Sequence, residues 1–105
     1  MTSSHSTGLS YQCLKLAVVC DSTHAEAYNN LGALEHRKEN YDQANAHYAA
    51  ATDIYEAKYN AALLAEERGD FQACFTCATA ALDTFEEHAD SKIVLDRLQK
   101  LFLSL

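Results

Sequence analysis

The stretch HAEAYNNLGALEHRKENYDQANAHYAAA, from His24 to Ala51, places small and bulky side chains at regular helical spacings. Small residues let two helices approach closely, and bulky residues fill the space left beside them. The positions concerned are Tyr28, Leu31, Gly32, Tyr41, Ala44, Tyr48 and Ala51. The stretch therefore predicts two packed helices in which the residue spacing serves packing rather than chemistry.

The composition of the whole chain favours helices. Its 105 residues are enough for one domain with a modest core, and 49% of them are hydrophobic and 22% charged, as in globular proteins. There is no proline, and there are only three glycines, so the residues that punctuate sheet-rich folds are scarce. An all-α fold is predicted.

The net charge of the chain limits the kinds of partner that it can bind. A net charge of −7 disfavours nucleic acid and anionic membrane surfaces. No apolar run approaches the roughly 20 residues that a membrane span requires, and residues 1–8 lack the features of a secretory signal. We expect a soluble, cytoplasmic protein with a flexible lead at 1–8 and no membrane insertion.

Apolar residues recur with helical periodicity in about six segments. The segments are 9–20, 25–37, 41–54, 56–68, 71–84 and 89–104. Between them lie short breaks with capping and turn residues: Asp21, Ser22 and Thr23 as caps, and Asn40 and Gly69 as left-handed turn residues. Such short connections make successive helices pack antiparallel.

The segments repeat at intervals close to 34 residues. Ala17, Ala51 and Ala81 close comparable apolar phrases, at intervals of 34 and then 30 residues. With its Leu31-Gly32 pair, this pattern resembles the tetratricopeptide repeat, an α-solenoid of antiparallel helix pairs. The second interval is about four residues short, which raises the hypothesis that four residues are missing between Ile54 and Tyr55.

The resemblance divides one helical domain, 9–105, into repeats. It implies a half repeat at 9–20, repeats at 25–54 and 55–84, and a capping helix at 88–104. In the second repeat, four positions depart from the family pattern in size: Ala61, Ala62, Cys74 and Ala78. The cap places Val94, Leu95, Leu98, Leu101, Phe102 and Leu105 on one face, and a membrane-surface helix is the competing interpretation. The first helix lacks a partner, so Leu14, Leu16 and Val18 are expected to be partly exposed and to favour self-association.

The segments YQCLKLAVV, AEAYNNLGALEHRK and LDRLQKLFLSL are similar to the C-terminal repeats of the tetratricopeptide subunits of the BBSome, a ciliary cargo-trafficking coat. This resemblance implies a piece of a longer scaffold that contacts other protein subunits or peptide cargo at a cilium, flagellum or basal body. It implies no catalysis and no cofactor.

In this family, the first helices of stacked repeats line a concave groove that binds partners. The predicted groove residues are Glu26, Asn29, Asn30, Ala33, His36, Arg37, Tyr59, Asn60, Leu63, Glu66 and Glu67. Asparagine amides can hold a peptide backbone because each offers donors and an acceptor, although these positions also fit a simple solvated helix surface. A co-chaperone or other peptide-binding adaptor is the alternative function, but it needs a basic clamp for a carboxylate tail, and Arg37 is the only cation in this set.

The candidates for metal or catalytic chemistry are weak. Cys74 and Cys77 have the spacing of half a zinc site, whereas Cys13 and Cys20 are too far apart to complete it, so buried packing thiols are the favoured interpretation. A catalytic pair would have to be His36 with Glu66 or Glu67, or His47 with a cysteine. We expect no catalytic site and no bound metal.

Overall fold

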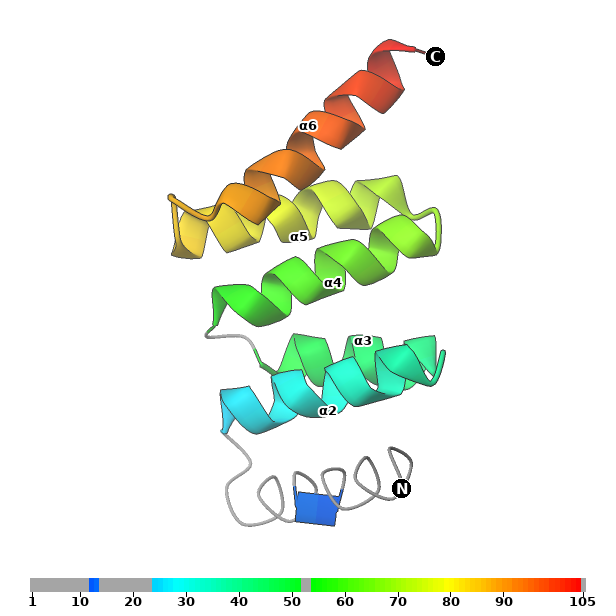
Figure 1. The fold of residues 1–105 in the computed structure, drawn as a ribbon, viewed down its shortest axis with the longest axis vertical. Helices are drawn as coiled ribbons and strands as arrows, with labels where there is room; N and C mark the ends of the chain where they lie inside the picture. The colour runs from blue at the N-terminus through cyan, green and yellow to red at the C-terminus, as the bar shows by residue number, and fades with distance from the viewer. Residues whose placement is uncertain (1–11, 14–23, 52–53, 105) are drawn as a thin grey trace, which may run out of the picture. The chain divides into compact units, whose positions relative to one another are not determined.

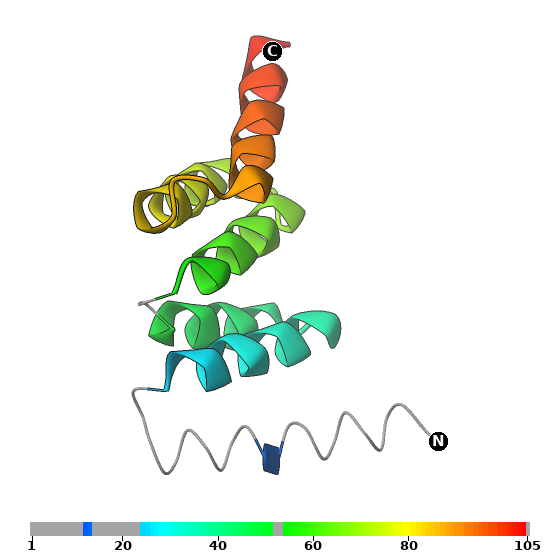
Figure 2. The same cartoon turned by 60° about the vertical axis from the view of Figure 1, so that its left-hand side comes forward.

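The computed structural model describes residues 12–13, 24–51 and 54–104, and these residues are almost entirely helical. The helices are α2 (Ala25–Arg37), α3 (Tyr41–Ala50), α4 (Tyr55–Glu67), α5 (Phe71–Thr84) and α6 (Ala89–Leu103). They fall into two compact units, Met1–Asp53 and Ile54–Leu105 (Figures 1 and 2). The fold is therefore all-α, with antiparallel helix pairs of the tetratricopeptide type.

Most of the predicted first helix, 9–20, lies outside the described residues. Gln12 and Cys13 are helical, and both are exposed. The lead at 1–8, the partial exposure of Leu14, Leu16 and Val18, and self-association through this helix all stay predictions.

The first unit contains a hairpin in which α2 packs on α3. Its buried apolar residues are Ala27, Leu31, Leu34, Ala44, Tyr48 and Ala51. The closest fit is between Gly32 and Tyr48, because a Cβ atom added at Gly32 would lie 2.5 Å from Cδ1 and Cε1 of the tyrosine ring. The missing side chain at Gly32 therefore lets the buried ring lie against the backbone of α2.

The second unit repeats the same hairpin with α4 and α5, thirty residues further along the chain. The positions equivalent to the buried alanines of the first hairpin, including Ala57, Cys74 and Ala81, are again fully buried. Ala62 and Ala78 take the places of Gly32 and Tyr48, and both have no exposed surface. The departures in residue size that the sequence showed therefore compensate each other. A glycine packs against a tyrosine in the first hairpin, and two alanines take those two positions in the second.

The turn inside each hairpin is a Schellman motif. In the first, Asn40 N–H donates to Glu35 O at 2.9 Å and Glu39 N–H donates to His36 O at 3.0 Å. In the second, the same bonds join Asp70 to Ala65 and Gly69 to Glu66. The residue with positive φ is Gly69 (φ 77°) in the second turn, as predicted, and Glu39 (φ 64°) in the first.

The expectation that Asn40 takes the left-handed position is therefore wrong. Asn40 is the N-cap of α3, with φ −86°, and its side-chain Nδ2 donates to Glu35 Oε1 at 3.2 Å. The Schellman hydrogen bonds require the left-handed residue at a fixed position after the end of the helix. That position is Glu39, so the greater tolerance of asparagine for the left-handed region does not decide which residue adopts it. Glu39 carries the strain that glycine avoids at position 69.

The helix caps also differ from the expected ones. His24 is the N-cap of α2, where its Nδ1 accepts from Ala27 N–H at 3.3 Å, whereas the predicted caps Asp21, Ser22 and Thr23 lie outside the described residues. Helix α3 ends at Ala50 instead of Ile54, and Ile54 has extended backbone before α4 begins at Tyr55.

The shortened repeat interval has a structural counterpart in the second helices of the hairpins. Helices α2 and α4 both have 13 residues, whereas α3 has 10 and α5 has 14. The difference of 14 − 10 = 4 residues is about one helical turn. The four-residue deficit thus falls at the end of α3, in a helix rather than in a loop, and the loss of residues between Ile54 and Tyr55 stays a hypothesis.

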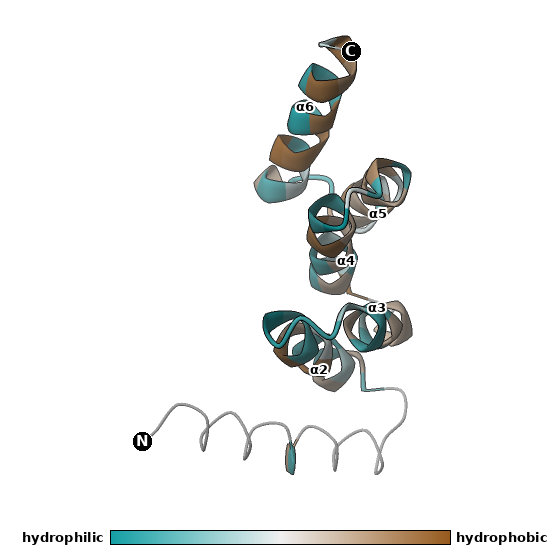
Figure 3. Cartoon of the chain, turned by 90° about the vertical axis from the view of Figure 1, so that its right-hand side faces the viewer, coloured by the Kyte–Doolittle hydropathy of each residue, from teal (hydrophilic) through white to brown (hydrophobic). Residues whose placement is uncertain are grey.

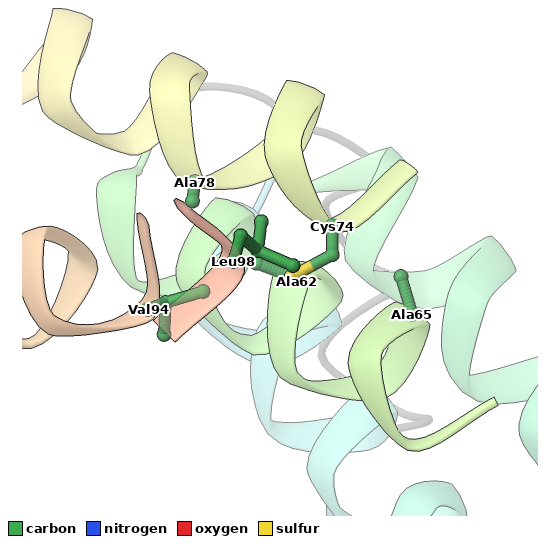
Figure 4. Close-up of a cluster of buried hydrophobic side chains, with 6 residues drawn as sticks. All are labelled: Ala62, Ala65, Cys74, Ala78, Val94 and Leu98. Carbon is green, nitrogen blue, oxygen red and sulfur yellow. The ribbon is translucent and has the colours of Figure 1, made fainter. Parts of the chain in front are cut away.

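Helix α6 closes the second hairpin with only part of its apolar face. Val94 and Leu98 join Ala62, Ala65, Cys74 and Ala78 in one buried cluster (Figure 4). One turn further on, Leu101, Phe102 and Leu103 are 36%, 49% and 79% exposed. The apolar stripe continues to the end of the helix (Figure 3), so the predicted capping helix covers the hairpin with its first half and leaves the end of its stripe exposed.

The fit of Gly32 against Tyr48 predicts a coupled pair of substitutions. Gly32→Ala should lower the free energy of unfolding by about 1–3 kcal/mol, because the new methyl group forces the buried ring to move. Tyr48→Ala should also destabilise, by about 3–5 kcal/mol, because it leaves a cavity. The double variant recreates the alanine pair of the second hairpin, so its loss should be smaller than the sum of the single losses by at least about 1 kcal/mol, measured by urea unfolding. Additive losses would show that the two positions do not restrict each other.

The left-handed residue of the first turn predicts a stabilising change. Glu39→Gly should raise the free energy of unfolding by about 0.5–1 kcal/mol, because glycine adopts positive φ without steric cost. Glu39→Gln is the matched control, since it keeps the strained backbone and removes the charge. The reverse change, Gly69→Glu, should destabilise by about 1 kcal/mol. A stabilisation by Glu39→Gln equal to that of Glu39→Gly would assign the effect to charge.

Candidate protein-interaction surfaces

The predicted groove residues of the first unit lie along α2. Three of them are exposed, namely Glu26, Asn30 and Arg37. The other three, Asn29, Ala33 and His36, are half-buried. The His36 ring is held in place, with Nδ1 3.2 Å from Tyr48 Oη and the ring edge-on to Tyr41 at 6.0 Å. Helix α2 therefore presents a polar strip whose histidine is oriented by α3.

The predicted groove residues of the second unit lie on the face of α4 that meets α6. Tyr59 and Leu63 pack against the buried cluster of that unit. Glu66 accepts two hydrogen bonds from Arg97 of α6, at 2.7 Å from Nη2 and 3.0 Å from Nε. A bidentate pair of this kind fixes both side chains, so this part of the strip is used to hold α6.

Of the remaining two predicted groove residues of the second unit, Asn60 is half-buried and Glu67 is exposed. The structure places each set on one helix of its own unit. The combination of the two sets into one groove, and the binding role of these residues, stay predictions.

The cysteines of α5 are buried in different degrees. Cys74 has no exposed surface, and burial raises the pKa of its thiol to about 11, with a further contribution from the Glu66 carboxylate. Cys77 is half-buried, and burial again raises its pKa. Both thiols are therefore protonated at neutral pH, and the packing interpretation of Cys74 is confirmed. Cys13 is exposed, and Cys20 lies outside the described residues.

The candidate catalytic pairs are engaged in other contacts. His36 contacts Tyr48, Glu66 is paired with Arg97, and the ring of His47 lies 6.3 Å from that of Tyr28. In the parts of the chain that the structure describes, no three His, Cys, Asp or Glu residues are grouped as metal ligands, and no helix is long and apolar enough to cross a membrane.

Sequence reasoning missed an aromatic cluster in the second unit. The ring of His88, at the N-cap of α6, lies 4.8 Å from Tyr55, 5.0 Å from Tyr59 and 6.1 Å from Phe85. Tyr55 and Phe85 are 4.9 Å apart. His88 is also anchored from below, because its Nδ1 lies 2.7 Å from Oγ of the fully buried Ser91. The sequence signals for it were the spacing of Tyr55 and Tyr59, four residues apart on α4, and of Phe85 and His88, three residues apart in the α5–α6 loop.

Acidic residues flank this aromatic cluster in the sequence. The exposed acidic residues on the flanking segments are Glu56, Asp83, Glu86, Glu87 and Asp90. Asp90 is close enough to contribute to the raised pKa of Tyr59, after the larger effect of burial. Lys58, on α4, donates to Thr84 Oγ1 at 2.6 Å.

These features define the class of the protein. Antiparallel helix pairs with matched small and large residues and Schellman turns are those of a tetratricopeptide-like α-solenoid. No family profile matches the chain.

Two characterised relatives are similar to it over nearly its whole length. The chain is 36% identical over 103 residues to tetratricopeptide repeat protein 8 of Homo sapiens and 37% identical over 103 residues to tetratricopeptide repeat protein 8 of Mus musculus. Each match covers 94% of this chain and 19% or 20% of the relative, so the chain spans about a fifth of the length of these relatives.

The buried thiol of Cys74 predicts a pH dependence. Its pKa is raised from 9.0 to about 11 in the folded state, so the stabilisation is complete below about pH 9 and is lost as the pH rises toward 11. Two pKa units correspond to roughly 2–3 kcal/mol at most. Cys74→Ala should fold, because Ala44 is the equivalent residue of the first hairpin, and it should flatten the fall in unfolding free energy over this range.

Urea unfolding at several pH values between 8 and 11 measures this dependence. Cys13→Ala, at an exposed thiol, is the control and should leave the alkaline loss unchanged. An equal alkaline loss in wild type and Cys74→Ala would contradict the assignment to Cys74.

Proposed function

We propose that the chain is part of a scaffold subunit of a BBSome-like complex, and that it acts in assembly and cargo contact at the cilium, flagellum or basal body. The observation that carries the proposal is the similarity to tetratricopeptide repeat protein 8 over 94% of the chain. The packing supports a role in contact with other proteins. The residues whose sizes complement each other lie between the helices, so their spacing serves to build a scaffold.

The polar strip of α2 is the proposed contact surface of the first unit. It presents the exposed amide of Asn30, next to Asn29, between Glu26 and Arg37. Amide side chains supply both donors and an acceptor, which suits the backbone of an extended peptide. In the second unit, Arg97 and the buried cluster already occupy most of the corresponding strip, so α2 is the stronger candidate for binding.

The alternative function, a co-chaperone that grips a carboxylate tail, has less support. Of the predicted groove residues, Arg37 alone is cationic, and Glu26, Glu66 and Glu67 are carboxylates. A carboxylate ligand would meet like charges at this surface. Arg97, a cation of α6 that reaches this set, is already paired with Glu66.

Affinity purification of the tagged chain from ciliated cells tests the proposal. We expect other BBSome subunits to co-purify with it and to co-migrate on a density gradient. Asn29→Ala with Asn30→Ala should reduce their recovery about ten-fold, as truncation at an interface hot spot does.

The matched control is Gln43→Ala with Asn45→Ala, which removes two exposed amides from α3 and should leave recovery unchanged. Circular dichroism verifies that each variant folds. Recovery of chaperones instead, with loss of binding in Arg37→Ala, would contradict the proposal and favour the co-chaperone.

A further inference from the structure

The aromatic cluster of the second unit lies at one end of the hairpin, where its Tyr59 ring packs against the buried core. It forms where the first turn of α4 meets the loop between α5 and α6 (Figure 1). Phe85 is the C-cap of α5, with extended backbone (φ −141°, ψ 95°), and it remains 40% exposed. Tyr55, Tyr59 and His88 are half-buried around it. The cluster therefore presents part of its aromatic surface, chiefly Phe85, to solvent.

The position of these rings is held by contacts to the rest of the unit. Tyr59 packs against the buried cluster below, and His88 is tied to the buried Ser91. Lys58 joins α4 to the end of α5 through Thr84. Because both sides of the patch are anchored, little conformational entropy would be lost when a ligand binds to it.

The charge around the patch is mostly negative. The segment DTFEEHAD, 83–90, contains four carboxylates and no lysine or arginine, and Glu56 follows Tyr55 on α4. The nearest cations in sequence are Lys58, which is bonded to Thr84, and Lys92, one turn into α6. A ligand at the exposed ring would thus meet π faces together with negative charge.

Aromatic faces and carboxylates together select a particular chemistry. A guanidinium group stacks on an aromatic ring and at the same time donates paired hydrogen bonds to a carboxylate. A lysine ammonium group makes the charge contact but stacks less well. Phosphate-bearing ligands and acidic peptides would be repelled.

We propose that Phe85, with Tyr55, His88 and the carboxylates of Glu86 and Glu87, forms a docking site for an arginine-bearing segment of a partner protein. The site is separate from the α2 strip and does not depend on assembly into a ciliary complex. Its failure in a binding assay would leave the proposed scaffold function untouched.

Fluorescence anisotropy with the whole 105-residue chain tests this site. The probe is a short labelled peptide of alternating glycine and arginine, compared with the same peptide carrying lysine or glutamate. At about 50 mM salt we expect the arginine peptide to bind more tightly than the lysine peptide, and the glutamate peptide not to bind.

Two variants separate the contributions of stacking and charge. Phe85→Leu keeps an apolar side chain but removes the π face, so it should weaken the arginine peptide about ten-fold and remove its preference over lysine. Glu86→Gln with Glu87→Gln should weaken both basic peptides. The control, Glu39→Gln with Asp42→Asn, removes two exposed carboxylates at the α2–α3 turn and should change binding less than about two-fold.

Three results would overturn the proposal. The first is equal weakening by the control pair, which would assign binding to net charge alone. The second is unchanged arginine preference in Phe85→Leu. The third is no binding of the arginine peptide at low salt by a wild-type chain with native helical circular dichroism.

Discussion

The closest approach of two helices in each hairpin depends on side-chain volumes that complement each other across the pair. In the first hairpin, Gly32 leaves room for the buried ring of Tyr48, whose hydroxyl then reaches His36. In the second hairpin, Ala62 and Ala78 take the same two positions. Because interiors are close-packed, one large residue requires one small residue opposite, and a chain can change both while the backbone arrangement remains. This constraint explains how the second unit departs from the family pattern in sequence and keeps its fold.

Helix α6 covers the second hairpin with only part of its length, and it also forms polar and aromatic contacts with α4. Val94 and Leu98 enter the hairpin core, and Arg97 extends across to Glu66. Beyond Leu98 the apolar stripe continues past the hairpin, where Leu101, Phe102 and Leu103 are exposed. The same docking brings the ring of His88 edge-on to the rings of Tyr55 and Tyr59, so the position of α6 creates both the Arg97–Glu66 ion pair and the aromatic patch at the start of the helix.

Charge gives the two surfaces different preferences. The α2 strip is mixed, with amides between Glu26 and Arg37, and suits a neutral peptide backbone. The aromatic patch is bordered by carboxylates and suits a cation. In a repeat protein, polar residues that are not used to hold the helices together are available for contact with partners.

The sequence by itself determined the helices and their pairing. Periodicity and short connections predicted α2, α4, α5 and α6 to within a residue or two, and Gly69 was correctly predicted in the left-handed position. The burial of Cys74 as a packing thiol was also predicted. These features depend on residues close in sequence or on a regular repeat, so local chemistry is enough to predict them.

Only the tertiary structure decided the rest. The bond from Arg97 to Glu66 joins residues 31 apart, and the rings of Tyr55 and Phe85 meet from different helices. Both depend on how α6 and its loop lie across the hairpin, which no local pattern encodes. Glu39 was likewise placed in the left-handed region by hydrogen bonds at the helix end, against its own preference. Long-range packing and backbone hydrogen bonding together outweigh single-residue propensity at these positions.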